Sequence, residues 1–280
     1  MNAPNVRAFE EVVIRPPGAF AHLDLLGLLR ARGTLWRKTV QRVRLQYDEM
    51  WAGLFWAVAR PLIMLAVIAG FRGMSGSNLG VSVSYPLYVY SGLVVWFYFT
   101  EATNAVASSL QRDAGIIQKV YYPRLISPLS CIGAETYNLG LAAIPLSILM
   151  AVFGAHPSWN ILLLPLVLAQ LMVLALGLGL VFSSLILLSR DWDRILRFGL
   201  YVGFWLSPVF YSSAMVPAQH STLYFANPMS GSLVAMRSAL FSDCPFPMRE
   251  WAYAVAAALG LLAVGLAMFQ RSERHLADRL

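Results

Sequence analysis

The chain has 280 residues, of which 58% are hydrophobic and only 12% are charged, and its formal net charge is +7. Soluble domains carry about 25% charged residues, so this composition excludes an ordinary soluble protein and predicts an all-α membrane protein with several spans. The positive charge does not indicate a nucleic-acid partner, because in a membrane protein the positions of Lys and Arg matter more than their sum.

Residues 1–50 form a predicted cytoplasmic N-terminal region without a signal peptide, since residues 1–20 are polar and contain three prolines. Within it, residues 22–47 are basic and repeat apolar side chains, Trp36 among them, at a spacing close to one helical turn. This pattern predicts an amphipathic helix on the cytoplasmic membrane surface. A linker helix packed on the bundle is the alternative that the same pattern allows.

Six stretches are apolar and long enough to cross a bilayer, which takes about 20 helical residues. They lie at residues 53–71, 87–107, 126–153, 161–188, 195–215 and 251–269, within a predicted transmembrane domain of residues 51–270. Pro208 interrupts the fifth stretch, and a cytoplasmic tail of residues 271–280 follows the sixth.

The positions of the positive charges predict the orientation. Of the 21 Lys and Arg residues, eight lie in the N-terminal region, and three each lie in the loop after the second stretch, the junction before the fifth and the tail. By the positive-inside rule, these parts and both termini are cytoplasmic.

Two segments between the stretches have a mixed character. Residues 108–128 combine an apolar stripe with polar positions, and Pro123 stops a helix within them. Periodicity alone does not decide between a docking helix and a plain turn. Residues 216–250, on the outer side, contain four prolines and a candidate helix over residues 230–241. This segment fits helices that dip into the outer membrane interface.

No motif in the sequence indicates catalysis. Neither of the two lysines lies in a GxxxxGK[ST] loop, so ATP hydrolysis is not expected in this chain. Asp191 and Asp193 resemble the metal-binding DxD of glycosyltransferases, but a polar turn neutralised by Arg190 and Arg194 has the same pattern. The scattered histidines and the two cysteines have no metal-ligand spacing, so no metal site is predicted.

Three charged residues fall inside the predicted spans away from their ends, where a charge is costly and commonly functional. They are Arg60, Glu101 and Glu135. Two interpretations stay open: Arg60 pairs with one of the acids inside the bundle, or the three side chains line a polar cavity.

Several ordered segments resemble the ABC-2 type permeases that export polysaccharides such as O-antigen, capsule and teichoic acid. Residues 116–124, IIQKVYYPR, with the PLS of residues 128–130, are similar to the family's most diagnostic stretch, although Gln118 stands where a lysine is usual. Residues 91–96, SGLVVW, and 206–208, LSP, are similar to its second and fifth helices. The resemblance covers residues 40–280.

The resemblance implies a homodimeric pore in the cytoplasmic (inner) membrane, placed above two ATPase subunits that hold the ATP and Mg²⁺. It further implies a lipid-linked polysaccharide as substrate, contacts with membrane lipids, an N-terminal interface helix and an outer gate within residues 216–250. Its coupling helix corresponds to residues 113–124, with candidate contacts to the ATPase at Asp113, Ile116, Ile117, Gln118, Lys119, Val120, Tyr121 and Arg124.

Aromatic residues are dense in the second and fifth stretches. An interfacial belt or core packing accounts for many such rings, and a tunnel in which sugars slide over ring faces is the third interpretation. The resemblance favours the tunnel, with a candidate glycan path of Trp56, Tyr88, Trp96, Phe97, Tyr98, Phe99, Tyr201, Phe204, Trp205 and Tyr211. An ABC-2 exporter of drugs or lipids, and a glycosyltransferase that uses Asp191 and Asp193, are the alternative functions.

Overall fold

The computed structural model describes residues 27, 30–48, 53–75, 83–117, 123–157, 159–212, 215, 219, 224–241 and 246–279. These residues form helices joined by turns and contain no strand, so the predicted all-α class is confirmed for them. The elements are α2 (Arg32–Asp48), α3 (Gly53–Ser75), α4 (Tyr85–Ala107), α5 (Ser109–Ile117), α6 (Ile126–Val152), η1 (Trp159–Leu163), α7 (Leu164–Ile186), α8 (Asp191–Leu206), α10 (Pro228–Leu240) and α11 (Met248–Arg279).

Three helical stretches within the described residues are long and apolar enough to cross a membrane. They are Ile126–Val152, Trp159–Ile186 and Met248–Ser272, at the third, fourth and sixth predicted spans. A shorter apolar run, Val58–Gly70, lies in α3, and α4 covers the second predicted span but carries polar and aromatic side chains. Six crossings, and the division into residues 1–50, 51–270 and 271–280, stay predictions.

Within the fifth predicted span, residues 195–215, helix α8 ends at Leu206 and residues 207–212 are not helical. Ser207 is extended, with φ −97° and ψ 149°, and Pro208 follows it. A residue before proline disfavours the helical conformation, because the proline ring clashes with its backbone. The interruption expected at Pro208 therefore coincides with the end of α8, and a membrane crossing by residues 195–215 stays a prediction.

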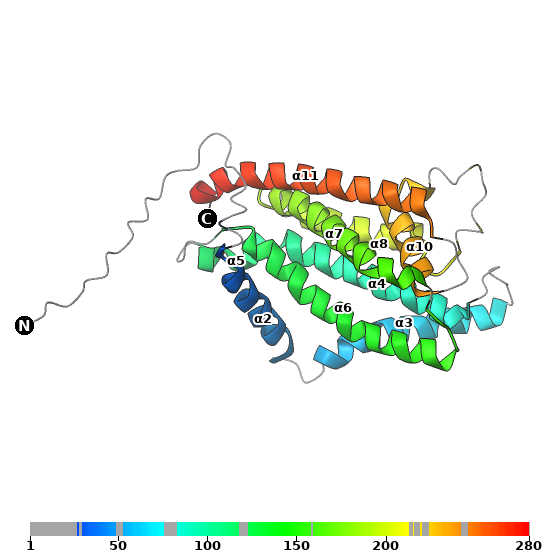
Figure 1. The fold of residues 1–280 in the computed structure, drawn as a ribbon. Helices are drawn as coiled ribbons and strands as arrows, with labels where there is room; N and C mark the ends of the chain where they lie inside the picture. Colours follow the sequence, from blue (N-terminus) through cyan, green and yellow to red (C-terminus); the bar gives the residue numbers. More distant parts are fainter. Residues whose placement is uncertain are drawn as a thin grey trace, which may run out of the picture.

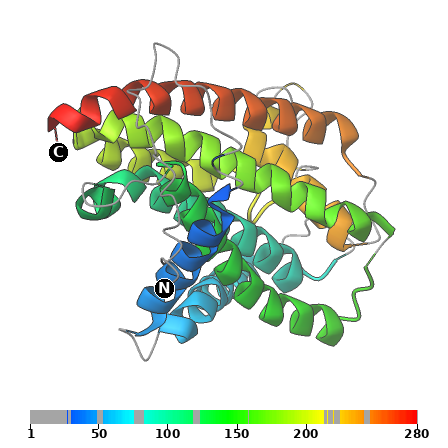
Figure 2. The same ribbon diagram turned by 60° about the vertical axis from the view of Figure 1, so that its left-hand side comes forward.

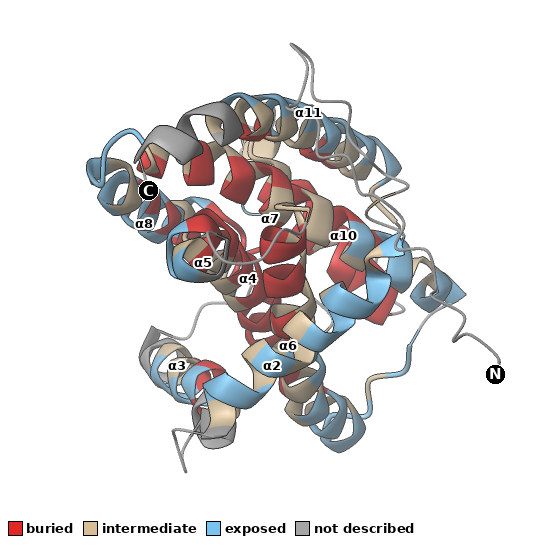
Figure 3. Ribbon diagram, turned by 90° about the vertical axis from the view of Figure 1, so that its left-hand side faces the viewer, coloured by how far each residue is buried: buried red, intermediate tan, exposed pale blue. Residues whose placement is uncertain are grey.

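The core lies between α4 and α7, with α6 packed on one side of α4 and α11 packed along α7 (Figure 1). Viewed along the bundle, the buried residues concentrate on α4, α7 and the faces turned toward them, whereas the outer faces of α2, α8 and α11 are exposed (Figure 3). Helix α4 is buried on nearly every side, which explains why its apolar residues show no one-sided pattern.

The two ends of the bundle differ. At one end α2 crosses α6, and α5 and the C-terminal end of α11 lie at this same end, while α10 lies at the other end (Figures 1 and 2). Helix η1 packs against α10 and therefore belongs to that second end. The elements predicted to be cytoplasmic thus gather at one end, opposite the predicted outer helix.

Candidate functional site

The predicted coupling segment begins in α5. Asp113 lies on the buried face of this helix, and Arg124 lies half-buried in the turn before α6. Ile116 and Ile117 end α5, but their side chains fall outside the described part of the chain. Four further candidate residues, Gln118, Lys119, Val120 and Tyr121, also fall outside it.

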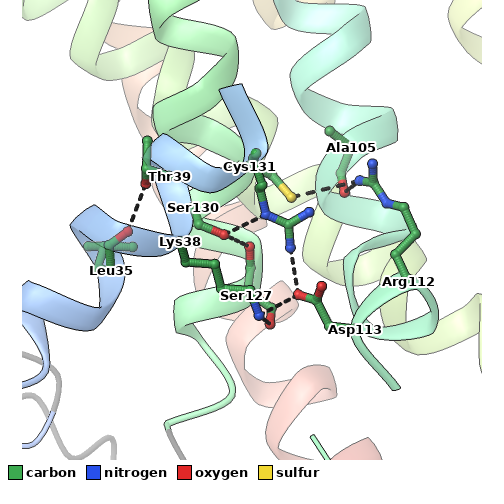
Figure 4. A network of polar contacts seen from close by, with 10 residues as sticks. Leu35, Lys38, Thr39, Ala105, Arg112, Asp113, Ser127, Ser130 and Cys131 are labelled. Carbon is green, nitrogen blue, oxygen red and sulfur yellow. Dashed lines mark hydrogen bonds and ion pairs between the residues drawn. The ribbon is translucent and has the colours of Figure 1, made fainter. Parts of the chain in front are cut away.

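A polar network joins α2 to this segment (Figure 4). Lys38 Nζ lies 2.7 Å and Arg42 Nη2 lies 2.5 Å from the same oxygen, Oδ2 of Asp113. Lys38 Nζ also donates to Ser127 Oγ at 3.0 Å, and Arg42 Nε donates to Ser130 Oγ at 2.7 Å. Three separate helices, α2, α5 and α6, therefore contribute to one cluster.

The environment of Asp113 favours its charged form. Burial by itself raises the pKa of the carboxyl group, but the hydrogen bonds from Lys38 and Ser127 and the charge of Arg42 outweigh it, so that the pKa lies below its ordinary value. The side chain is only 8% exposed. Asp113 is thus a buried anion whose charge is balanced within this chain.

The charged residues of the predicted spans are placed in two groups. Arg60 on α3 forms an ion pair with Glu101 on α4, and these side chains are 57% and 46% exposed in the single chain. On α6, Glu135 accepts a hydrogen bond from Asn138 Nδ2 at 2.9 Å, and Tyr47 on α2 donates to Asn138 Oδ1. Arg60 is therefore paired, yet the pair lies on a surface and not deep inside the bundle.

The candidate path residues divide by exposure. Tyr88, Trp96, Tyr98, Phe99 and Phe204 are buried in the core of the single chain, and Phe97 and Tyr211 are half-buried. Of the candidates whose side chains the structure describes, Tyr201 and Trp205, at 63% and 51%, are well exposed. The side chain of Trp56 falls outside the described residues.

The buried and exposed rings are nevertheless continuous. Trp96 on α4 contacts Phe204 on α8, with ring centroids 5.9 Å apart, and Phe204 contacts the exposed Trp205 at 5.4 Å. Phe210 and Tyr211, beyond the end of α8, extend the row at 5.9 and 5.4 Å. One aromatic cluster therefore links α4 to the non-helical segment after α8.

Arg237 on α10 is a site residue that the sequence interpretation did not include among its candidates. It is 4% exposed and donates to the carbonyl oxygens of Pro208 and Val209 at 2.6 and 2.7 Å. It also donates to the Tyr88 hydroxyl at 2.8 Å. A side chain at Gly92 would lie 2.5 Å from Nη2 of Arg237, so the glycine leaves room for the guanidinium group. The sequence signals were an arginine inside the apolar candidate helix of residues 230–241 and its place in a stretch that resembles the outer loop of the polysaccharide permeases.

The DxD pair lies in the first turn of α8 and is engaged by arginines of the same helix. Asp191 pairs with Arg194 at 3.2 Å, and Asp193 pairs with Arg197, not Arg190, at 2.9 Å. Acidic residues in the first turn also interact favourably with the positive end of the helix dipole. Among the described residues there is no group of three or more side chains that could hold a metal ion.

Comparison with known proteins gives consistent matches over most of the chain. Residues 34–241 match the family described as ABC-2 type transporter. The chain is 28% identical over 248 residues to the O-antigen export system permease protein RfbA of Klebsiella pneumoniae, covering 86% of this chain and 93% of that protein.

Two further relatives span similar lengths. An O-antigen export system permease protein RfbA of Myxococcus xanthus is 24% identical over 257 residues, or 90% of this chain and 97% of the relative. The polysialic acid transport protein KpsM of Escherichia coli is 21% identical over 239 residues, or 84% and 91%.

Proposed function

This chain belongs to the ABC-2 type transporter family, and we propose from that premise that it is the membrane-spanning permease subunit of an ATP-driven polysaccharide exporter. The observation that carries the proposal is the match to O-antigen and polysialic acid exporters along nearly their whole length. Membership of the family and the three apolar helices make the chain a membrane protein. As a permease, it is not itself an enzyme.

The proposed complex holds two copies of this chain and two ATPase subunits, which bind ATP and Mg²⁺. Its proposed location is the cytoplasmic (inner) membrane, with both termini in the cytoplasm, in agreement with the distribution of Lys and Arg. Residues 113–124 are proposed to receive the motion of the ATPase, through Lys119 and its neighbours. The proposed substrate is a lipid-linked glycan such as O-antigen or capsule.

The face that carries Arg60 and Glu101 supports this assembly. A charged pair about half exposed within a span cannot face hydrocarbon at low cost. We therefore place it against a second copy or a water-filled passage. The exposed rings of Tyr201 and Trp205 are proposed to lie along the glycan path, since aromatic faces contact sugars without a charge, and Trp205 also contacts Phe204 of the buried cluster.

A pull-down of the tagged chain from detergent-solubilised membranes, followed by mass spectrometry, tests the proposal. We expect a stoichiometric ATPase subunit, with nucleotide hydrolysis that the cognate lipid-linked glycan stimulates. The Lys119→Glu variant should remain folded but lose the ATPase or its stimulation. A chain that purifies alone and turns over a nucleotide sugar would contradict the proposal, and stimulation by a drug or lipid alone would contradict the glycan substrate.

A further inference from the structure

Asp113 lies in the segment proposed to meet the ATPase, but its carboxylate points into the chain toward α2 (Figure 4). With 8% of its side chain exposed, it has little surface to offer a partner protein. The chemistry of this residue therefore acts between helices of the same chain.

The geometry is that of a shared carboxylate oxygen. Lys38 and Arg42 are four residues apart on α2, so both side chains lie on one face of the helix. They are 11% and 15% exposed, and both contact Oδ2 of Asp113. Without the anion between them, two partly buried cations would face each other, which is strongly unfavourable.

Two hydroxyl groups of α6 complete the cluster. Ser127 accepts from Lys38 and Ser130 accepts from Arg42, while Ser130 Oγ itself donates to the Ser127 carbonyl oxygen at 2.7 Å. Ser127 and Ser130 are three residues apart at the start of α6, on one face of that helix. The two cations of α2 thus bridge α5, at the proposed ATPase contact, to the first turn of a membrane span.

We infer that Asp113 is a positioning residue which ties α2 to α5 and α6, so that the three helices move as one body when the ATPase displaces α5. The inference rests on the proposed function, because the displacement comes from the ATPase. Helix α2 then transmits motion to α6 in addition to lying at the membrane surface. The connection between α2, α5 and α6 depends on the charge of Asp113 more than on its size.

The test uses the full complex with both native cysteines replaced by serine, in nanodiscs for the distance measurement and in sealed proteoliposomes for the export measurement. Spin labels at Thr34→Cys on α2 and Gln111→Cys on α5, both exposed positions, report the distance between these helices. Asp113→Asn should broaden this distance distribution and leave the ATPase bound. It should also lower glycan export per ATP hydrolysed by roughly tenfold, a typical size for coupling between sites.

Two arginines of α2 provide a matched comparison. Arg42→Met removes one cation of the cluster and should act in the same direction as Asp113→Asn. Because Lys38 stays on the carboxylate in this variant, it also serves as the test if Asp113→Asn fails to fold. Arg44→Met makes the same chemical change at an exposed position of the same helix and should change neither readout.

An unchanged distance distribution in Asp113→Asn would overturn the inference, as would a broadened distribution with normal export per ATP. The proposed function would stand in both cases. A wild-type chain that neither binds an ATPase nor exports a glycan would overturn the proposed function and the inference together. This outcome is seen in the wild type, before any substitution is made.

Discussion

At the scale of single residues, the charge of Asp113 contributes more to the stability of the fold than its volume does. The carboxylate sits between two cations, and its folded-state pKa is held below the ordinary value of about 4. A group with a depressed pKa stabilises the fold at any pH above its unfolded value. This contribution is lost as the pH falls through the folded value.

We therefore expect the difference in stability between the wild type and Asp113→Asn to become smaller toward acidic pH. From pH 8 to 5 the variant should be less stable by about 3 kcal/mol, the cost typical of breaking a buried ion pair. Below about pH 4 the difference should shrink, because the wild-type carboxyl group takes up a proton. Thermal unfolding of both proteins in detergent at each pH measures it, and a difference that grew toward acid would contradict the assignment.

Arg237 shows at the same scale how one side chain compensates a break in the backbone. The chain leaves helical geometry at Ser207, so carbonyl groups near Pro208 lose their usual helical partners. The guanidinium group supplies donors to two of these oxygens and stacks over the Tyr88 ring, 3.6 Å from its centroid. Helix α10, which is predicted to lie on the outer side, is thereby held to both α4 and the segment after α8.

At the scale of elements, α7 and α11 approach each other closely through glycines. A side chain at Gly177 would lie 2.6 Å from the Leu262 nitrogen, and one at Gly265 would lie 2.6 Å from the Gly177 carbonyl oxygen. Small residues let backbones approach and increase van der Waals contact, which drives helix association where no hydrophobic effect operates. The obstacle at each position is backbone, which cannot move aside as a side chain can.

Two glycines of α11 therefore make a matched pair. Gly265→Ala should lower the stability by about 1–3 kcal/mol, the usual cost of overpacking. Gly260→Ala, whose added methyl group would meet nothing within 4 Å, should be neutral or slightly stabilising, since alanine favours helix. Thermal unfolding in detergent distinguishes them, and equal midpoints would show that the two helices separate more readily than their spacing indicates.

Helix α2 also differs from a simple amphipathic helix at this scale. Lys38 and Arg42 on its inner face bind α5 and α6, while Trp36 and Leu45 are 69% and 56% exposed. An exposed tryptophan beside basic residues is typical of a membrane interface. Of the two interpretations of residues 22–47, packing on the bundle is seen for the inner face of α2, and the interface helix stays a prediction for its exposed face.

At the scale of the whole molecule, the elements separate into two ends. α2 and α5 lie at one end, while α10 and the η1 helix packed against it lie at the other (Figure 1). The long apolar helices run between these ends, so the bundle has the arrangement that crossing a bilayer requires. The positively charged segments predicted to be cytoplasmic share the α2 end.

This arrangement makes a prediction about topology. In a cysteine-free background, Thr34→Cys on α2 should react with a membrane-impermeant thiol reagent only in inside-out vesicles. Trp159→Cys on η1, at a position 89% exposed, should react only from the outside of intact cells. Labelling of both positions from the same side would contradict the orientation that the positive charges indicate.

The sequence by itself determined the class of the molecule. Composition indicated a helical membrane protein, hydropathy marked the stretches that became α3, α4, α6, α7 and α11, and the motifs between residues 91 and 130 indicated the family that the comparisons confirmed. These properties are readable because hydrophobicity, proline positions and ordered motifs are local along the chain. Even the early end of α8 has a local cause in Pro208, although the sequence alone did not say where the helix would stop.

Only the tertiary structure decided which side chains meet. Asp113 is 71 residues from Arg42, and Arg237 is 149 residues from Tyr88, so no periodicity relates them. The same holds for the aromatic residues, where packing between α4 and α8 buries Trp96 and leaves Trp205 exposed. Local patterns specify helices and their apolar faces, but partners come from the way those helices pack, and packing depends on the shape of every side chain at the interface.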